Sequence, residues 1–362
     1  MHRSSVQRIL MTADAVGGVW RYALDLGGAL SDRGVLVSLA VMGPPPDAAG
    51  LREAEQRGLT VVHRPYRLEW MDDPWEDVRR AGQWLLALER TLLPDIVHLN
   101  GYAHAALRWS APVVVVAHSC VRTWWRAVKG EPAPDRLDGY RTAVTKGLAR
   151  AQLVIAPTRA MLDALQVEYG VRLPARVVPN GCRLPPGEPS ALDAKEPFVL
   201  AAGRAWDEAK NITALCDVAA RVSWPVCVAG ADTAPGGHGC GLSGVRRLGR
   251  LTPGDLASWY RRAAIYALPA KYEPFGLSVL EAASAGCALV LGDIESLREN
   301  WTGAAVFVPP DRRDALAAAI EDLVARPGRR RDLAGRAAAR AAELTIDHTA
   351  GEYLRLYEDL AE

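Results

Sequence analysis

The stretch Glu273-Pro274-Phe275-Gly276-Leu277-Ser278-Val279-Leu280-Glu281 decides the fold, because it turns at a glycine and then opens an apolar helix. A helix that begins at about Leu277 leaves the backbone N–H groups of its first turn without intrahelical partners. Those groups and the helix dipole favour an anion such as a phosphate. Carboxylates repel an anion, so Glu273 and Glu281 are better suited to accept hydrogen bonds from hydroxyl groups. The pattern predicts a ligand with phosphate at its centre and hydroxyls at both ends, as in a nucleotide sugar.

On both sides of this stretch, short apolar runs alternate with helical patterns along the whole chain, and this predicts parallel sheets covered by helices on both faces. Helices are predicted at Val19–Arg33 and Glu76–Thr91, among others. The predicted fold class is α/β, with two doubly wound, Rossmann-like domains that face each other across a cleft. The predicted strands are Arg8–Thr12, Val35–Met42, Leu59–His63, Asp95–Leu99, Pro112–Ala117, Leu153–Ala156, Arg176–Val178, Phe198–Ala202, Val226–Ala229, Val245–Leu248, Ile265–Leu268, Ala288–Leu291 and Ala304–Val308.

A chain of 362 residues suits two domains rather than one core. The turn sequence Val178–Arg183 and the Pro/Gly/Ser-rich residues after it predict a linker at about 179–195. We therefore expect an N-terminal, acceptor-side domain over residues 1–180 and a nucleotide-sugar-binding domain over 181–345. Residues 346–362 predict an amphipathic helix that can pack back on the N-terminal domain.

Composition narrows the class of protein. The formal net charge is +1, so no strong field favours nucleic acid as a partner. The longest apolar run, Ala111–Ala117, is far too short to span a membrane, and no secretory signal is apparent at the start. The six cysteines form no C-x-x-C pair, which favours reduced structural thiols. We expect a cytoplasmic protein, with peripheral contact at the inner membrane face as a further possibility.

Four groups of residues follow predicted strands, where open α/β sheets bind their ligands. Gly17 and Gly18 allow backbone to approach a ligand and point a helix N-terminus at an anion. His118 can bond a sugar hydroxyl. Arg204 and Lys210 can grip phosphate groups. The turn that contains Arg250 and Leu251 can offer backbone groups to a nucleotide base.

Three of these groups also have a purely structural reading. The glycine pair can be a tight turn, and His118 a satisfied histidine at a strand end. Arg204 and Lys210 can belong to a surface loop of mixed charge that Asp207 and Glu208 neutralise. No D-x-D and no compact His/Asp/Glu cluster occurs in the sequence, so no bound metal is expected and the cations must carry the charge of a leaving diphosphate.

At this point the chain resembles retaining GT-B glycosyltransferases, and specifically glycosyltransferase family 4, also described as glycosyl transferases group 1. Glu273 with Glu281 resembles the paired-glutamate signature, and Gly203-Arg204 with Lys210 resembles the phosphate-binding pair. The resemblance covers about Ile9 to about Pro310. One departure is Asn211, where many members have glycine after the lysine; asparagine is tolerable at a helix start.

The resemblance implies a hexosyltransferase that needs no metal or other cofactor. A UDP- or GDP-linked sugar would donate a hexose, with retained configuration, to an acceptor hydroxyl in glycan, polysaccharide or glycolipid synthesis. Catalytic roles fall to His118, Glu273, Arg204 and Lys210. Donor binding falls to Gly17, Gly18, Arg250, Leu251, Phe275, Gly276, Leu277, Ser278 and Glu281. Glu273 would contact hexose hydroxyls, Glu281 the ribose, and the N–H groups near Gly276 and Ser278 the phosphate or sugar.

The acceptor, a sugar, a glycolipid or a small molecule, is expected to meet aromatic and basic residues of the N-terminal domain. The candidates are Trp70, Trp124, Trp125 and Arg126, which can stack on a sugar ring and hold an anionic group, touch a membrane surface, or simply pack in the core. Two rivals stay open: a non-catalytic nucleotide-sugar-binding protein and a GT-B nucleotide-sugar epimerase.

Overall fold

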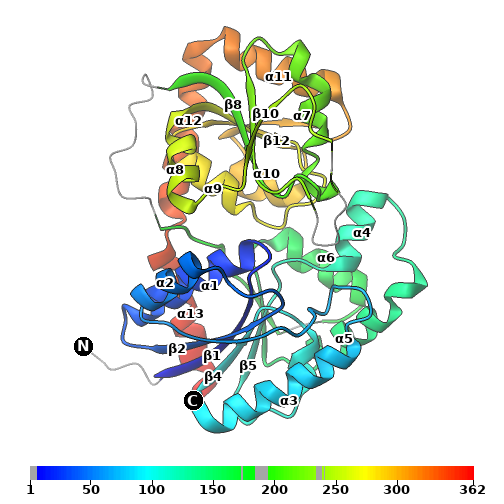
Figure 1. Cartoon of the computed structure of the whole chain (residues 1–362), viewed down its shortest axis with the longest axis vertical. Coiled ribbons are helices and arrows are strands. Elements are labelled where there is room, and N and C mark those ends of the chain that lie inside the picture. The colour runs from blue at the N-terminus through cyan, green and yellow to red at the C-terminus, as the bar shows by residue number, and fades with distance from the viewer. Residues whose placement is uncertain (1–5, 173, 184–194, 234–238, 240) are drawn as a thin grey trace. The chain divides into compact units, whose positions relative to one another are not determined.

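The computed structural model describes residues 6–172, 174–183, 195–233, 239 and 241–362 of the chain. It divides into two compact units (Figure 1). The first contains the residues up to Arg126, then Glu131–Gly181 and Ile346–Glu362, and the second contains Ala127–Gly130 and Cys182–Thr345. Residues 184–194, which make up most of the predicted linker, lie outside the described residues.

The first unit holds a parallel sheet of seven strands in the order β3-β2-β1-β4-β5-β6-β7. Its strands are β1 (Arg8–Asp14), β2 (Leu36–Met42), β3 (Thr60–Arg64), β4 (Ile96–Leu99), β5 (Val113–Val116), β6 (Leu153–Ala156) and β7 (Ala175–Val177). Its helices are α1 (Gly18–Ser31), α2 (Ala48–Gln56), α3 (Trp75–Leu92), most of α4 (Val121–Lys129, whose last three residues belong to the second unit), α5 (Asp138–Leu148), α6 (Arg159–Tyr169) and α13 (Ile346–Ala361), with 3-10 turns η1 (Ala103–Ala106) and η2 (Asp135–Leu137).

The second unit holds a parallel sheet of six strands in the order β10-β9-β8-β11-β12-β13. The strands are β8 (Glu196–Ala202), β9 (Val226–Ala229), β10 (Arg246–Gly249), β11 (Ala263–Leu268), β12 (Ala288–Gly292) and β13 (Ala305–Val308). The helices are α7 (Thr213–Val218), α8 (Pro253–Arg262), α9 (Leu277–Ser284), α10 (Glu295–Trp301), α11 (Arg313–Ala325) and α12 (Pro327–Glu343), with 3-10 turns η4 (Glu208–Lys210) and η5 (Ala219–Arg221).

Alternation along β1 shows how the first sheet is covered on both faces. Ile9 and Met11 belong to an apolar cluster that includes residues of α1 and α13, whereas Leu10 packs in a separate cluster with Ala81 and Leu85 of α3. Successive side chains of a strand point to opposite faces, so helices cover both sides. The predicted α/β class with two doubly wound parallel sheets is confirmed, and every predicted strand is present within three residues at each end.

Helix α13 belongs to the first unit although it ends the chain. It packs along α1, and the hydroxyl of Thr349 donates to the backbone oxygen of Pro179 over 2.9 Å. Tyr353 and Tyr357 of this helix are fully buried. The amphipathic pattern at 346–362 therefore reflects burial of one helix face against this unit.

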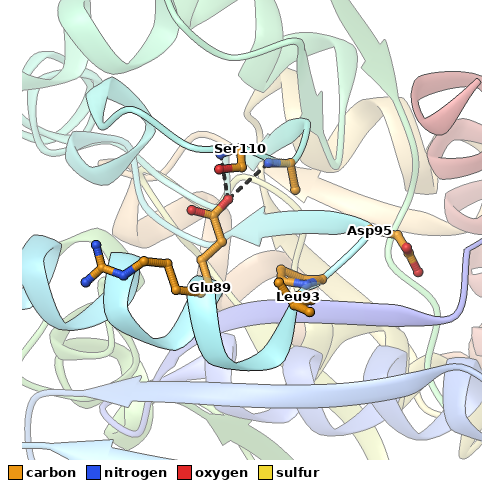
Figure 2. Close-up of a pocket in the computed structure, with 7 residues that line it drawn as sticks. Glu89, Leu93, Asp95 and Ser110 are labelled. Carbon is orange, nitrogen blue, oxygen red and sulfur yellow. Dashed lines mark hydrogen bonds between the residues drawn. The ribbon is translucent and has the colours of Figure 1, made fainter.

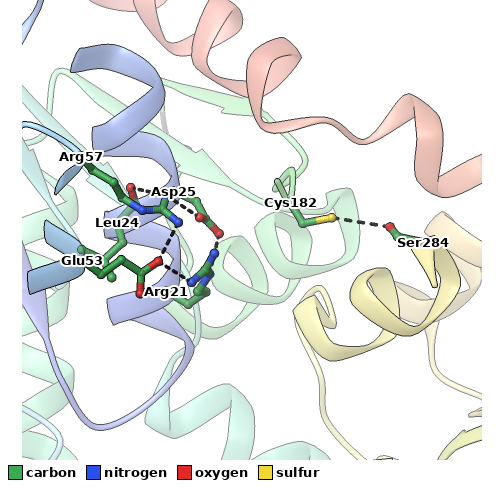
Figure 3. Close-up of polar contacts among 7 residues, drawn as sticks. All are labelled: Arg21, Leu24, Asp25, Glu53, Arg57, Cys182 and Ser284. Atoms are coloured by element: carbon green, nitrogen blue, oxygen red, sulfur yellow. Dashed lines mark hydrogen bonds and ion pairs between the residues drawn. The ribbon is translucent and has the colours of Figure 1, made fainter. Parts of the chain in front are cut away.

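Polar side chains also tie the elements of each unit together (Figure 3). Between α1 and α2, Arg21 and Arg57 alternate with Asp25 and Glu53 in a closed set of ion pairs of 2.7–2.9 Å. In the second unit, Sγ of Cys182 lies 3.6 Å from Oγ of Ser284. The five cysteines within the described residues are free thiols, and Cys240 lies outside that part of the chain.

Candidate functional site

Each sheet has a point at which the strand order reverses, and such points are where open α/β sheets bind ligands. In the first unit, β1 lies between β2 and β4; in the second, β8 lies between β9 and β11. The segments that follow β1, β5, β8 and β11 carry most of the predicted site residues.

In the second unit, β8 ends at Ala202 and leads into Gly203 and Arg204. Gly203 has φ +156°, and the neighbouring Gly230 comes so close that a Cβ there would lie 1.8 Å from the Gly203 backbone oxygen. Arg204 Nη2 donates to Asp207 Oδ2 over 2.8 Å, and its guanidinium lies 5.2 Å from the ring centre of Trp206. Arg204 is therefore oriented on two sides and still partly exposed, as an anion-binding side chain must be.

Lys210 and Glu273, which are 63 residues apart in the sequence, form an ion pair through Nζ and Oε2. Their side chains are 18% and 10% exposed, so water screens the pair only weakly. The Glu273 backbone oxygen accepts from the Ser296 hydroxyl over 2.6 Å, which fixes the turn. The structure thus brings Lys210 and Glu273 together at the reversal between β8 and β11.

Asn211 was expected at a helix start, and this interpretation is wrong. It lies between η4 and α7 in the left-handed region, with φ +54°. Its side-chain amide donates to the backbone oxygens of Pro269 and Pro310 over 2.8 and 2.9 Å. Glycine and asparagine adopt this conformation most easily, which accounts for asparagine at a position where many members have glycine.

Helix α9 begins at Leu277, as predicted, and Gly276 is its capping residue, with φ +91°. No side chain caps it and its first turn holds no acidic residue, whereas α8 is capped by the Thr252 hydroxyl, which accepts from the Asp255 N–H. Phe275 is buried in the core beneath this turn. Ser278 Oγ lies 2.7 Å from the hydroxyl of Tyr266, which also lies 3.2 Å from the Ala202 backbone oxygen. The N–H groups at Leu277 and Ser278 are therefore available to an anion.

The remaining donor candidates of the second unit lie near the same strand ends. Glu281 is on α9, and its carboxylate adds to burial in raising the pKa of Tyr260 well above its usual value. Arg250 and Leu251 follow β10, and Gly249 before them accepts from the Gly230 N–H over 2.8 Å. The Arg250 side chain is exposed.

In the first unit, α1 begins at Gly18 with Gly17 as its capping residue, and this helix too has no side-chain cap and no acid in its first turn. The carboxylate of Asp14, at the end of β1, accepts from the Val16 N–H over 2.9 Å and shapes the loop. The first-turn N–H groups of α1 are therefore open to an anion, as those of α9 are.

His118 follows β5, as predicted, and its Nε2 lies 2.8 Å from Oδ1 of Asn100. The same oxygen lies 3.0 Å from Nε2 of His98, whose Nδ1 lies 2.5 Å from the Tyr357 hydroxyl. Tyr22 meets the His118 ring edge-on, with 4.3 Å between ring centres. Burial lowers the pKa of His98 to about 4, and burial together with His98 lowers the pKa of His118 to about 3. Both imidazoles are neutral at pH 7.

The acceptor candidates fall in two places of the first unit. Trp124, Trp125 and Arg126 lie together on α4, with the two tryptophan rings 6.3 Å apart. Glu168 of α6 accepts from both Arg126 and Arg122, so one buried carboxylate faces two guanidiniums. Trp70, which is 40% exposed, lies in the loop between β3 and α3.

Sequence reasoning missed Asn100 and His98. Asn100 directly follows β4, as His118 follows β5, so the same strand-end rule could have found it. It also missed Glu69, whose carboxylate accepts from the backbone N–H groups of Tyr102 and Ala103 over 2.8–3.1 Å and ties the Trp70 loop to η1. Nothing in the sequence pattern around Glu69 indicates this contact.

A hollow of about 330 Å³ in the first unit lies away from these residues (Figure 2). Leu93 and Asp95 before β4 and Ser110 and Ala111 before β5 line it, so it is at the amino ends of the strands. The carboxylate of Glu89 in this hollow already accepts hydrogen bonds from the backbone N–H groups of Ser110 and Ala111. Among the described residues, none of the helices has the length and apolar character of a transmembrane span, and no three His, Cys, Asp or Glu side chains are grouped so as to hold a metal ion.

The sequence matches family models and known proteins that fit this arrangement. The profile described as "Glycosyltransferase Family 4" matches residues 16–184, and the one described as "Glycosyl transferases group 1" matches residues 196–326. A D-inositol 3-phosphate glycosyltransferase of Actinosynnema mirum is 31% identical over 73% of this chain and 72% of its own length. A phosphatidyl-myo-inositol mannosyltransferase of Mycobacterium tuberculosis is 28% identical over 96% of this chain and 94% of its own.

Solved structures share the fold. Sucrose-phosphate synthase from Thermosynechococcus elongatus superposes with a TM-score of 0.80 at 19% identity, over 98% of this chain and 99% of that one. Anabaena Alr3699/HepE, in complex with UDP-glucose, gives 0.73 at 18% identity, over 96% and 99%. The chain has two doubly wound sheets with polar groups at the points where the strand order reverses. Together with these similarities, this arrangement defines a glycosyltransferase of the GT-B architecture. The chain belongs to glycosyltransferase family 4.

Proposed function

We propose that this enzyme transfers a hexose from a nucleotide-diphosphate sugar to an acceptor hydroxyl, with retained anomeric configuration and without a bound metal. The observation that carries the proposal is the set of groups at one end of β8 and β11: two cations, one carboxylate and an uncapped helix. Arg204 and Lys210 lie there with Glu273 and the start of α9. Cations and helix N–H groups suit a diphosphate, and a carboxylate suits sugar hydroxyls.

The roles follow from the chemistry of each group. Arg204, Lys210 and the N–H groups of Leu277 and Ser278 bind the diphosphate. On binding, the phosphate oxygens replace Glu273 as the partner of Lys210, and the freed carboxylate accepts from hexose hydroxyls. Glu281 accepts from the ribose, and the backbone at Arg250 and Leu251 meets the UDP or GDP base. His118 accepts from a sugar hydroxyl, and the N–H groups at Gly17 and Gly18 bind an anionic group.

The proposed reaction is a front-face displacement. The bond between the anomeric carbon and the phosphate oxygen breaks while the acceptor oxygen bonds to the same face of that carbon. The departing phosphate oxygen takes the acceptor proton, so no protein base is needed. Positive groups that hold the phosphate as its charge grows lower the barrier, and each such contact is worth on the order of 3 kcal/mol.

For the acceptor, we propose a cyclic polyol that carries a phosphate group. Relatives named for inositol 3-phosphate and for phosphatidyl-myo-inositol support this class, as does the pair of guanidiniums, Arg122 and Arg126, that share one carboxylate. Trp124, Trp125 and Trp70 offer stacking surfaces for a ring. We also propose a cytoplasmic location, with peripheral membrane contact where the acceptor is a lipid.

One experiment tests the function. The full chain is incubated with UDP- and GDP-sugars in excess EDTA, with inositol 3-phosphate or unphosphorylated inositol as acceptor, and products are followed by NMR. We expect a product only with the phosphorylated acceptor, and an unchanged anomeric configuration. An inverted product, strict dependence on added Mg²⁺, or a 2-epimer of the donor would each contradict the proposal. Tight donor binding with neither transfer nor hydrolysis would identify a binding protein instead.

A further inference from the structure

The hydrogen bonds around Asn100 determine which nitrogen of His118 carries its proton. The Asn100 side-chain amide is oriented by Thr12 of β1: its Nδ2 lies 2.6 Å from the Thr12 backbone oxygen, which can only accept. The Asn100 backbone N–H also donates to the Thr12 hydroxyl over 2.9 Å. The opposite amide orientation would place two oxygens 2.6 Å apart, so Oδ1 must be the atom that faces the histidines.

An amide oxygen accepts and never donates. Both imidazole nitrogens in contact with it, Nε2 of His98 and Nε2 of His118, must therefore carry hydrogens. Since both rings are neutral, each Nδ1 holds a lone pair. At His98 this lone pair accepts from the Tyr357 hydroxyl over 2.5 Å. At His118, Nδ1 has no hydrogen-bond partner among the described residues, and the side chain is only partly buried.

We propose that Asn100, His98 and Tyr357 are positioning residues that hold His118 as its neutral Nε2–H tautomer, so that Nδ1 accepts a hydrogen bond from a substrate hydroxyl. The inference rests on the proposed function, since it deepens the role of His118 there. It gives α13 a part in the site: the last helix of the chain supplies the hydroxyl that fixes His98. The titratable groups around the two rings are Tyr22 from α1 and Tyr353 and Tyr357 from α13. Burial raises the pKa of all three tyrosines, so no charge reaches the pair at neutral pH.

The tautomers of His98 and His118 can be measured without an activity assay. Nitrogen-15 NMR of the full chain separates the seven histidines, and His98→Gln and His118→Gln assign the two signals. We expect Nε2–H on both rings at pH 7. Nδ1–H or a doubly protonated ring at His118 would overturn the inference.

A matched pair of variants tests the role of α13. Tyr357 and Tyr353 are both fully buried and both pack against His98, but only the Tyr357 hydroxyl contacts its nitrogen. Tyr357→Phe should shift the Nδ1 signal of His98 and lower kcat/KM severalfold. Tyr353→Phe should leave both unchanged. Equal effects of the two variants would contradict the assignment.

The variant Asn100→Asp tests whether the protonation state of His118 matters for substrate binding. The carboxylate favours the protonated rings, so the acid limb of the kcat/KM profile should move up by at least about one pH unit. On the acid side of that limb, kcat/KM should fall about tenfold below that of the unchanged protein, mainly through KM, and recover at higher pH, which a merely misfolded variant would not do. The expected NMR signals with an unshifted pH profile would overturn the role in substrate binding. Absence of any transfer by the unchanged protein would instead overturn the proposed function, and the NMR result would stand.

Discussion

The strand reversals of the two units hold polar groups of opposite kinds. In the second unit the groups are charged and paired, Arg204 with Asp207 and Lys210 with Glu273, so their formal charges cancel. In the first unit His118, Asn100 and His98 form a neutral network. Paired charges can change partners when an anion arrives, whereas a neutral network offers only directed hydrogen bonds. One reversal is suited to binding a charged group and the other to orienting an uncharged one.

The largest expected effect is the loss of stability when acid protonates the histidines of the neutral network. The folded-state pKa values of His98 and His118, about 4 and about 3, lie below the value near 6.5 of an unfolded chain. The unfolded state therefore binds protons first, and stability that is complete above about pH 6.5 is lost as the pH falls. The two histidines together should cost about 4 kcal/mol of unfolding free energy between pH 7 and pH 5.

Urea unfolding at several pH values measures this loss. The matched control is the double variant His98→Gln/His118→Gln, which should lose less stability than the unchanged protein over the same pH range. Identical pH dependence of the two proteins would show that these histidines are not held neutral.

The next largest effect is expected when the ion pair between Lys210 and Glu273 is broken by substitution. Glu273→Gln keeps the shape of the side chain but removes its charge, so it can no longer accept several hydroxyl hydrogen bonds as a carboxylate does. Turnover should fall by roughly a hundredfold or more. Asp314→Asn is the control, because it removes a carboxylate from an exposed ion pair with Arg221 in the same unit. Steady-state kinetics with a UDP- or GDP-sugar measure the turnover of each variant. Nearly equal rates for Glu273→Gln and the unchanged protein would show that Glu273 does not contact the substrate.

Asn211 supports the charged reversal of the second unit, because its side chain holds the loop that follows Lys210. Asn211→Ala loses two hydrogen bonds to backbone oxygens and places alanine at φ +54°, and it should cost about 2–3 kcal/mol. Asn211→Gly loses only the hydrogen bonds and should cost about 1 kcal/mol less. Thermal or urea unfolding compares the two. Equal costs would mean that the left-handed backbone contributes nothing to the choice of residue here.

Sequence patterns predicted the strands and the glycine-initiated helix because these depend on local signals. Leu153–Ala156 and Val226–Ala229 are apolar runs whose ends the structure reproduces, and Gly276 has the positive φ that the turn requires. The polar contacts depend on the tertiary fold. Tyr357 meets His98 across 259 residues, and Lys210 meets Glu273 across 63. No periodicity encodes such pairs, so the sequence located the strand ends but could not say which of their side chains are partners.

The smallest expected effect concerns the helix that begins at the charged reversal. Gly276 and Gly303 have similar positive φ angles, +91° and +84°, so alanine at either should cost about 1 kcal/mol of stability. At Gly303 a Cβ meets nothing within 4 Å, but at Gly276 it would lie 3.0 Å from Val279 Cγ2 on the first turn of α9. That turn must shift by a few tenths of an ångström and with it the N–H groups proposed to bind phosphate. Gly276→Ala should therefore weaken UDP or GDP binding severalfold in a thermal-shift titration, while Gly303→Ala should not. Equal weakening would assign the loss to general destabilisation, and no weakening in either would place the diphosphate away from the start of α9.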